Sequence, residues 1–137
     1  MHGRLPVFLA ALWWGSLTTL GFFVVPMLFA HLPTPAMAGG MAARLFTGQT
    51  WVTLACGLLL LMTSRQKGTR APTDWAPGAM VFIVGGLLLA LLVEFAVAPR
   101  IVARENLQLW HAVGSGMYLL QWLYAGAVLW KTSAPRG

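Results

Sequence analysis

The chain alternates between long apolar segments and short polar ones. The apolar segments run over about residues 5–29, 45–62, 78–98 and 107–130. A membrane-spanning helix needs roughly 20 predominantly apolar residues, so each segment predicts one transmembrane helix. Prolines, paired glycines and charged residues separate the segments, as expected of connecting loops. The pattern therefore predicts a single transmembrane domain over residues 1–137, folded as an all-α, integral membrane four-helix bundle.

Composition supports this class of protein. Hydrophobic residues make up 58% of the 137 residues, charged residues 9%, and the mean hydropathy is +0.74. Soluble domains carry roughly 25% charged residues, because their surfaces face water. We therefore expect a multi-pass protein whose main contact is the lipid bilayer.

The net charge of +6 bears on possible partners and on the orientation in the membrane. The basic residues fall in short flanks between apolar segments and form no cluster, so no nucleic-acid partner is expected. Four spans place both termini on one side, where 6 of the 9 lysines and arginines also lie. The positive-inside rule then predicts an N-in/C-in orientation.

A short internal repeat relates the first and third segments. FFVVPMLFA (22–30) aligns with FAVAPRIVA (95–103), with Phe, Val, Pro and Ala matching at a constant offset of 73 residues. The two segments run in the same direction, so a genuine repeat would consist of two parallel helical hairpins. A chance match between apolar sequences is the alternative. Pro26 and Pro99, at equivalent positions, are each expected to kink or end their helix.

Every segment carries a stripe of small or polar residues at helical spacing, which membrane helices use to pack against one another. Segment three presents Glu94 among alanines and a glycine, and segment four presents a stripe that includes Gln121. The stripes are expected to face inward. The candidate intramembrane polar site consists of the residues on them that carry chemistry: His111, Glu94, Gln49, Ser115 and Tyr118.

Depth groups three of these residues. Gln49, Glu94 and His111 each lie about four or five residues from the expected ends opposite the termini, roughly 6–8 Å deep at 1.5 Å per residue. An ionisable residue within a span is expensive and is a functional hypothesis by default. Pairing of Glu94 with His111 is the simplest arrangement, and Arg44 and Arg100 are alternative partners for the carboxylate. A purely structural, hydrogen-bonding role for both residues is the other interpretation.

The sequence supplies no signature of an enzyme and no catalytic residue. Phosphate-binding glycine loops, zinc-binding H-E-x-x-H and the hydrolase G-x-S-x-G elbow are all missing. Cys56 is the single cysteine, so a cysteine-cluster metal site is excluded, and one histidine within a span does not ligate a haem from both sides. We expect no cofactor and no metal.

Several segments together resemble a known family. The first helix reads WWGSLTTLGFFVVPMLFAHL, the third ends in VAP, and the fourth opens with WHAVGSGMYLL. This resembles the bacterial branch of the transmembrane protein 205-like family, small four-helix membrane proteins of unknown function. Positions that carry the resemblance include the structural motif Gly15, Gly21, Pro26 and Pro99, together with His111. The resemblance implies the fold and residence in the bacterial inner membrane, and it implies no reaction.

Three functional hypotheses follow. The first is a transport-related or accessory membrane subunit, active as a homo-oligomer or in a larger membrane complex, with its polar site on the periplasmic side. The second is a haem-, metal- or quinone-linked redox protein that uses His111, Glu94 and Tyr118. The third is a membrane scaffold without a small-molecule site.

Overall fold

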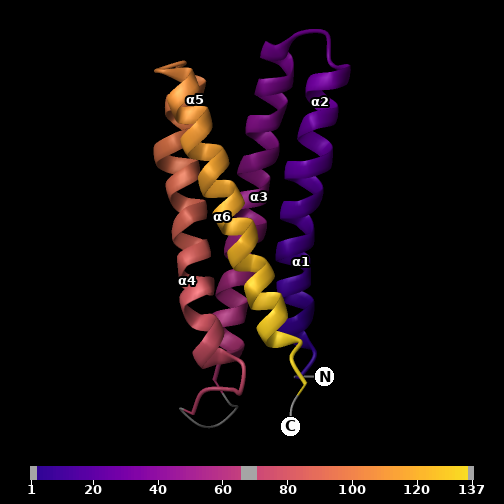
Figure 1. Ribbon diagram of the computed structural model, residues 1–137, viewed down its shortest axis with the longest axis vertical. Coiled ribbons are helices and arrows are strands. Elements are labelled where there is room, and N and C mark those ends of the chain that lie inside the picture. Colours follow the sequence, from indigo (N-terminus) through magenta and orange to yellow (C-terminus); the bar gives the residue numbers. More distant parts are fainter. Residues whose placement is uncertain (1–2, 66–70, 136–137) are drawn as a thin grey trace.

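The computed structural model describes residues 3–65 and 71–135. Within these residues, four helical spans are long and apolar enough to cross a membrane: Leu5–His31, Pro35–Thr63, Ala76–Val102 and Leu107–Thr132. The spans lie side by side as an antiparallel bundle, and the first span begins at the same end at which the fourth one finishes (Figure 1). The predicted all-α four-helix membrane fold is confirmed.

The first and third spans are each interrupted in the same way. The first consists of α1 (Leu5–Thr19), a π-helical turn η1 (Leu20–Val24) and α2 (Val25–His31). The third consists of α4 (Ala76–Leu92), a π-helical turn η2 (Val93–Val97) and α5 (Ala98–Val102). The second and fourth spans are single helices, α3 (Pro35–Thr63) and α6 (Leu107–Thr132).

The helices form a ring in the order α1, α3, α4 and α6, each packed on its two neighbours. Side chains from opposite helices meet along the centre of the ring. The largest fully buried side chains include Trp13 of α1, Leu60 of α3, Ile83 of α4 and Val128 of α6. Large hydrophobic side chains on the outside remain exposed, as the lipid-facing surface of a membrane protein requires.

The second helix begins ten residues earlier than the sequence pattern indicated, at Pro35 instead of residue 45. Thr34 caps it, because its Oγ1 accepts a 3.2 Å hydrogen bond from the Met37 amide. Pro35 fits the first turn, where a missing N–H costs nothing. The Gly39–Gly40 pair, expected in a loop, lies inside the helix. The helix therefore includes both glycines, because the Thr34 cap and Pro35 in the first turn favour a helix start before them.

This boundary changes the depth of Gln49. Gln49 lies fourteen residues into α3 (35 to 49), or about 21 Å along the helix at 1.5 Å per residue. The expectation that Gln49 lies only four or five residues from the start of its helix is therefore wrong. Gln121 lies equally far into α6 (107 to 121), so the two glutamines occupy the same level near the middle of the bundle.

The sequence repeat has a structural counterpart. The two π-helical turns, Leu20–Val24 and Val93–Val97, are separated by 73 residues, the offset of the sequence match. Pro26 and Pro99 follow them at equivalent positions. A proline ring clashes with the carbonyl four residues earlier and supplies no N–H. Widening the preceding turn relieves that clash, and Val25 and Ala98 donate to Leu20 and Val93, five residues back.

Burial repeats along the two hairpins as well. All four buried residues of α6 lie 72 residues after a buried residue of α3: the pairs are Gln49 and Gln121, Thr53 and Ala125, Cys56 and Val128, and Leu60 and Thr132. Trp13 of α1 and Gly86 of α4 are likewise equivalent at an offset of 73 and contact each other, since a Cβ on Gly86 would lie 2.5 Å from the Trp13 ring. The molecule thus contains two structurally similar hairpins. Most equivalent positions in the interface between the hairpins carry different residue types.

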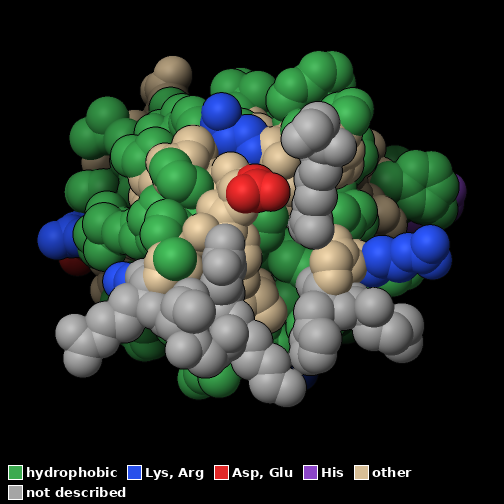
Figure 2. Space-filling model, turned by 90° about the horizontal axis from the view of Figure 1, so that it is seen from below, with side chains coloured by type: hydrophobic (Ala, Val, Ile, Leu, Met, Phe, Trp, Pro, Cys, Tyr) green, Lys and Arg blue, Asp and Glu red, His purple; other side chains and the backbone are tan. Residues whose placement is uncertain are grey.

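Charged residues lie at both ends of the bundle. At the end where α5 finishes and α6 begins, the exposed ones include Arg44, Arg100, Arg104 and Glu105. At the end where α1 begins and α6 finishes, exposed charged residues include Arg4, Arg65 and Asp74. Figure 2 views this end and shows an acidic side chain near the middle, with basic side chains beside it and at the edges, among hydrophobic ones. The concentration of charge at the ends and its scarcity along the sides are what a membrane-spanning bundle requires.

Candidate functional site

A buried polar network crosses the middle of the bundle, and Gln121 is its centre. The Gln121 Oε1 atom accepts a 3.3 Å hydrogen bond from the indole Nε1 of Trp13 and a 3.0 Å bond from Oγ1 of Thr53. The side chain is only 4% exposed, and those of Trp13 and Thr53 are fully buried. Gln121 therefore joins α6 to both α1 and α3.

Gln49 extends the network. Its Nε2 donates to Oγ of Ser16 at 2.9 Å and, more weakly, to Oγ1 of Thr53 at 3.4 Å. Ser16 in turn donates to the carbonyl of Trp13. Gln49 is 8% exposed, so the sequence prediction that it faces the interior of the bundle agrees with its position. Interhelical bonds of this kind hold membrane helices together.

A small cavity of about 20 Å³ lies beside the two glutamines. Its lining comes from three spans and includes Phe46, Gln49, Ala90, Val93, Tyr118 and Gln121. The volume matches a single water molecule, which needs roughly 10–15 Å³. The interior of one copy therefore has no room for a larger solute at this level.

Tyr118 and Gly21, which the sequence singled out separately, are in contact in the structure. The Tyr118 hydroxyl donates a 2.6 Å hydrogen bond to the carbonyl of Leu17 and would lie 3.0 Å from a Cβ added to Gly21. A Cβ on Gly21 would lie 2.5 Å from the Tyr118 ring. The absence of a side chain at position 21 is thus what admits the tyrosine.

Glu94 lies in η2 and is half-buried. Its Oε1 accepts a 2.9 Å hydrogen bond from Oγ1 of Thr47, on α3. Arg100, an expected alternative partner, instead donates to the carbonyl of Ala96 at 2.6 Å and lies 4.7 Å above the Trp110 ring. No cation of the described residues forms an ion pair with this carboxylate.

The structure does not bring His111 to Glu94. His111 is exposed on α6, and so is Ser115 one turn later. The side of α6 that meets the third span is formed at this level by Gly114, whose Cα lies against Val97 and Ile101. No hydrogen bond or ion pair of the described residues joins His111 to Glu94, whose described partner is Thr47. The candidate residues therefore divide into an interior group of Gln49 and Tyr118 and more exposed positions.

Gln121 is the residue that the candidate site lacked. It was placed on the inward stripe of segment four but was interpreted as packing. The signal that identifies it is its equivalence to Gln49 in the repeat, which appears once the 72-residue offset of α3 and α6 is known. The sequence match covered only the first and third segments and therefore did not include it.

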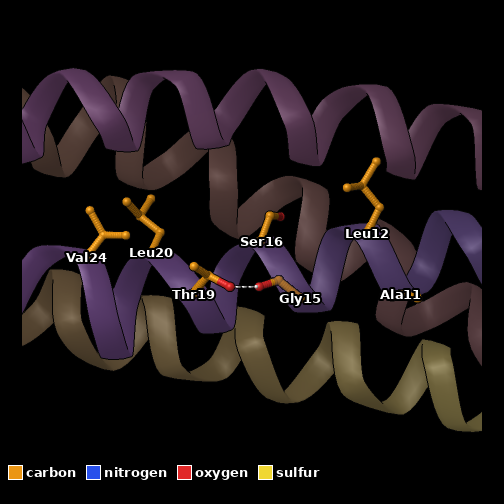
Figure 3. Close-up of a pocket in the computed structure, with 7 residues that line it drawn as sticks. All are labelled: Ala11, Leu12, Gly15, Ser16, Thr19, Leu20 and Val24. Atoms are coloured by element: carbon orange, nitrogen blue, oxygen red, sulfur yellow. Dashed lines mark hydrogen bonds between the residues drawn. The ribbon is translucent and has the colours of Figure 1, made fainter.

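An open groove runs along the outside of α1. It offers about 460 Å³ and is lined by Ala11, Leu12, Gly15, Ser16, Thr19, Leu20 and Val24. Figure 3 shows Leu12, Ser16, Leu20 and Val24 projecting on the side of α3, and Thr19 hydrogen-bonded to the Gly15 carbonyl. Nothing lies within 4 Å of a Cβ added to Gly15, so this motif glycine faces the surroundings and not a neighbouring helix.

Metal chemistry has little support in the side chains that are present. Within residues 3–65 and 71–135, no group of three or more histidine, cysteine, aspartate and glutamate side chains could hold a metal ion. Cys56 is buried and unpaired in the bundle. His111 and Glu94 belong to no such group.

Comparison with known proteins identifies the family. The profile of the domain of unknown function DUF4149 matches residues 8–109. The chain belongs to this family. No curated protein and no solved structure matches the chain. The family description carries no activity, so the function has to be inferred from the geometry of the polar residues.

Proposed function

We propose that this DUF4149 protein is an accessory subunit of a transport-related assembly in the bacterial inner membrane, with Glu94 as the residue that engages its partner. The observation that carries the proposal is the incomplete pairing of Glu94. Its carboxylate lies in a membrane span, is half-buried, and accepts a single described hydrogen bond, from Thr47.

The energetic argument concerns this carboxylate in contact with lipid. A charged side chain within a span costs about 3 kcal/mol even by the lowest scales, and such residues normally face a partner or a polar cavity. One hydroxyl donor offsets only part of that cost. A donor or cation from a second protein, placed against the seam between α3 and η2, would complete the coordination of the carboxylate.

The interior of the bundle supports an accessory role over a solitary carrier. The cavity beside Gln49 and Gln121 is about 20 Å³, which is far below the volume of most transported solutes. A transported solute would therefore pass between this chain and another subunit. The resemblance to the transmembrane protein 205-like family supports membrane residence and is compatible with this role.

The orientation belongs to the same proposal. Both ends of the described chain lie at one end of the bundle, and the flanks at that end contain more lysine and arginine than the opposite turns. The positive-inside rule then puts the termini in the cytoplasm. Glu94, in the half of the third span remote from that end, would lie nearer the periplasm.

Photo-crosslinking in native membranes tests the proposal. A photoreactive amino acid at Thr47, next to Glu94, is compared with one at Leu119, an exposed residue of α6. We expect a discrete protein crosslink from position 47, lost in the Glu94→Gln variant and retained in Glu105→Gln, whose carboxylate lies in the exposed turn. The proposal would be overturned if both positions crosslinked to lipid alone and if native mass spectrometry gave the Glu94→Gln variant the same assembly mass as the wild type.

No observation favours the redox alternative, and its test is independent. The absorption spectrum and elemental analysis of the purified protein report a bound haem or metal directly. A Soret band or a stoichiometric metal would favour the redox alternative over the accessory role. The scaffold alternative predicts a crosslink at position 47 that Glu94→Gln leaves intact, because shape and not the carboxylate would then hold the partner.

A further inference from the structure

The two π-helical turns offer a comparison inside one molecule. At η1, the Leu20 amide bonds to the carbonyls of Leu17 and Ser16, and the Tyr118 hydroxyl supplies a second donor to the Leu17 carbonyl. The same hydroxyl lies beside Gly21, 3.0 Å from where a Cβ of that residue would be. A side-chain oxygen has thus entered the helix ladder where the π-helical turn opens it.

At η2 the backbone is arranged in the same way, but the side chain differs. The Val93 amide bonds to the carbonyls of Ala90 and Leu89, and Ala90 is equivalent to Leu17 at the 73-residue offset of the π-helical turns. The starts of α3 and α6 are 72 residues apart. At the same offset, the residue of α3 that is equivalent to Tyr118 is Phe46. Phenylalanine has no hydroxyl to place there.

The small cavity lies at this point. Phe46, Ala90 and Val93, the equivalents of Tyr118, Leu17 and Leu20, all line its approximately 20 Å³. Tyr118 and Phe46 face each other across the centre with ring centroids 5.4 Å apart. The volume therefore adjoins the position that a hydroxyl on Phe46 would occupy.

Two amide atoms give this cavity polar partners. Gln49 Oε1 and Gln121 Nε2 take part in none of the described hydrogen bonds, which use Gln49 Nε2 and Gln121 Oε1 instead. Both side chains line the cavity and are more than nine-tenths buried. Among the described residues, no fully enclosed side-chain nitrogen or oxygen lacks a hydrogen-bond partner, so these two atoms must keep some accessible surface, which the cavity supplies. An unpaired donor or acceptor in the apolar membrane interior costs several kcal/mol, and a water in the cavity would remove that cost.

We propose that the cavity is a binding site for one structural water molecule. The water accepts a hydrogen bond from Gln121 Nε2, donates one to Gln49 Oε1, and donates its other proton to the Ala90 carbonyl. It does at η2 what the Tyr118 hydroxyl does at η1. A buried water typically makes about three such bonds, and this cavity supplies that number of partners from three spans.

The site goes beyond the proposed accessory role and does not depend on it. It completes the network that joins α1, α3 and α6, so it stabilises the bundle from within. Its partners are the Gln49 and Gln121 side chains and the Ala90 backbone. Glu94, which the proposed function uses, takes no part, so the two proposals can fail separately.

Nuclear magnetic resonance of the full chain in detergent micelles tests the site. Selectively labelled glutamine side-chain amides are examined for cross-peaks to long-lived water. We expect a cross-peak from the Gln121 side-chain amide in the wild type. The solvent-exposed Gln108 amide, in the first turn of α6, serves as the control for rapidly exchanging water. The absence of long-lived water at Gln121 would overturn the proposal.

The Phe46→Tyr variant makes the test specific. Its hydroxyl is expected to displace the water, so the cross-peak at Gln121 is lost while the thermal midpoint is maintained or raised. Phe29→Tyr, on the exposed surface of α2, should leave the cross-peak unchanged. Persistence of the same cross-peak in a folded Phe46→Tyr protein would contradict the assignment to this cavity.

The reciprocal Tyr118→Phe variant should gain a water contact at the Gly21 amide. If no water contact appeared there, the equivalence of the two sites would be contradicted.

Discussion

The Tyr118 hydroxyl donates a 2.6 Å hydrogen bond to the Leu17 carbonyl, where α1 gives way to the π-helical turn η1. This contact joins α6 to α1 through the backbone and not through a second side chain. It also explains why Gly21 has no side chain, since a Cβ there would lie 2.5 Å from the tyrosine ring. Three features of the sequence, a glycine, a tyrosine and a following proline, therefore belong to one structural unit.

Loss of this unit is expected to destabilise the bundle. Tyr118→Phe removes one interhelical hydrogen bond, worth about 0.6–1.7 kcal/mol in a membrane protein. Gly21→Ala is expected to cost more, about 1–3 kcal/mol, because the added Cβ overpacks against the ring. Unfolding by sodium dodecyl sulphate, followed by circular dichroism, measures both free energies.

The matched control is Gly15→Ala, on the same helix. Nothing lies within 4 Å of a Cβ at that position, and alanine is favoured over glycine in a helix by up to about 1 kcal/mol. Gly15→Ala is therefore expected to be neutral or stabilising. Equal losses of stability for Gly15→Ala and Gly21→Ala would contradict a role for the Tyr118 contact.

The buried glutamine of α6 is expected to be more sensitive than a surface one. Gln121→Leu leaves the Trp13 indole N–H and the Thr53 hydroxyl without their acceptor. Each buried donor left unpaired costs about 1–3 kcal/mol. The same substitution at exposed Gln108 should change the free energy of unfolding by less than about 0.5 kcal/mol. Similar values for the two variants would show that the network contributes little.

Trp13 and Gly86 are expected to be energetically coupled. Gly86→Ala should destabilise the wild type by about 1–3 kcal/mol, because its Cβ would meet the Trp13 ring. In a Trp13→Leu background the ring atoms are gone, so the same substitution should cost little. A double-mutant cycle measures the coupling, expected to be about 1 kcal/mol or more. Additive effects of the two substitutions would disprove the close packing of these equivalent positions.

The early start of α3 depends on its cap. Thr34→Ala removes the acceptor of the Met37 amide and is expected to cost about 1 kcal/mol. Hydrogen exchange followed by mass spectrometry should then accelerate in the first turns of α3 and stay unchanged near Thr53. Ser133→Ala, at the exposed end of α6, is the control. Unchanged exchange in the first turns would indicate that packing, and not the cap, holds this part of the helix.

The candidate site was predicted only in part, and the misplaced residues show why. Gln49 was correctly expected to face inward, but its distance from the start of α3 was wrong because the helix begins after a cap at Thr34. His111 was expected to pair with Glu94, yet His111 is exposed and the described partner of the carboxylate is Thr47. Helical spacing identifies residues that share a face. It does not identify the neighbouring helix that the face meets.

The sequence alone was sufficient for the class of protein and for four spans that alternate in direction, because length and hydrophobicity decide what crosses a bilayer. It also contained the 73-residue repeat. Only the tertiary structure revealed that each repeated proline follows a π-helical turn, and that Tyr118 enters one turn while Phe46 faces the other. It also decided that Gln121, and not His111, lies at the centre. These outcomes depend on how the helices rotate and pack against one another, which is settled by contacts between distant segments and not by any local pattern.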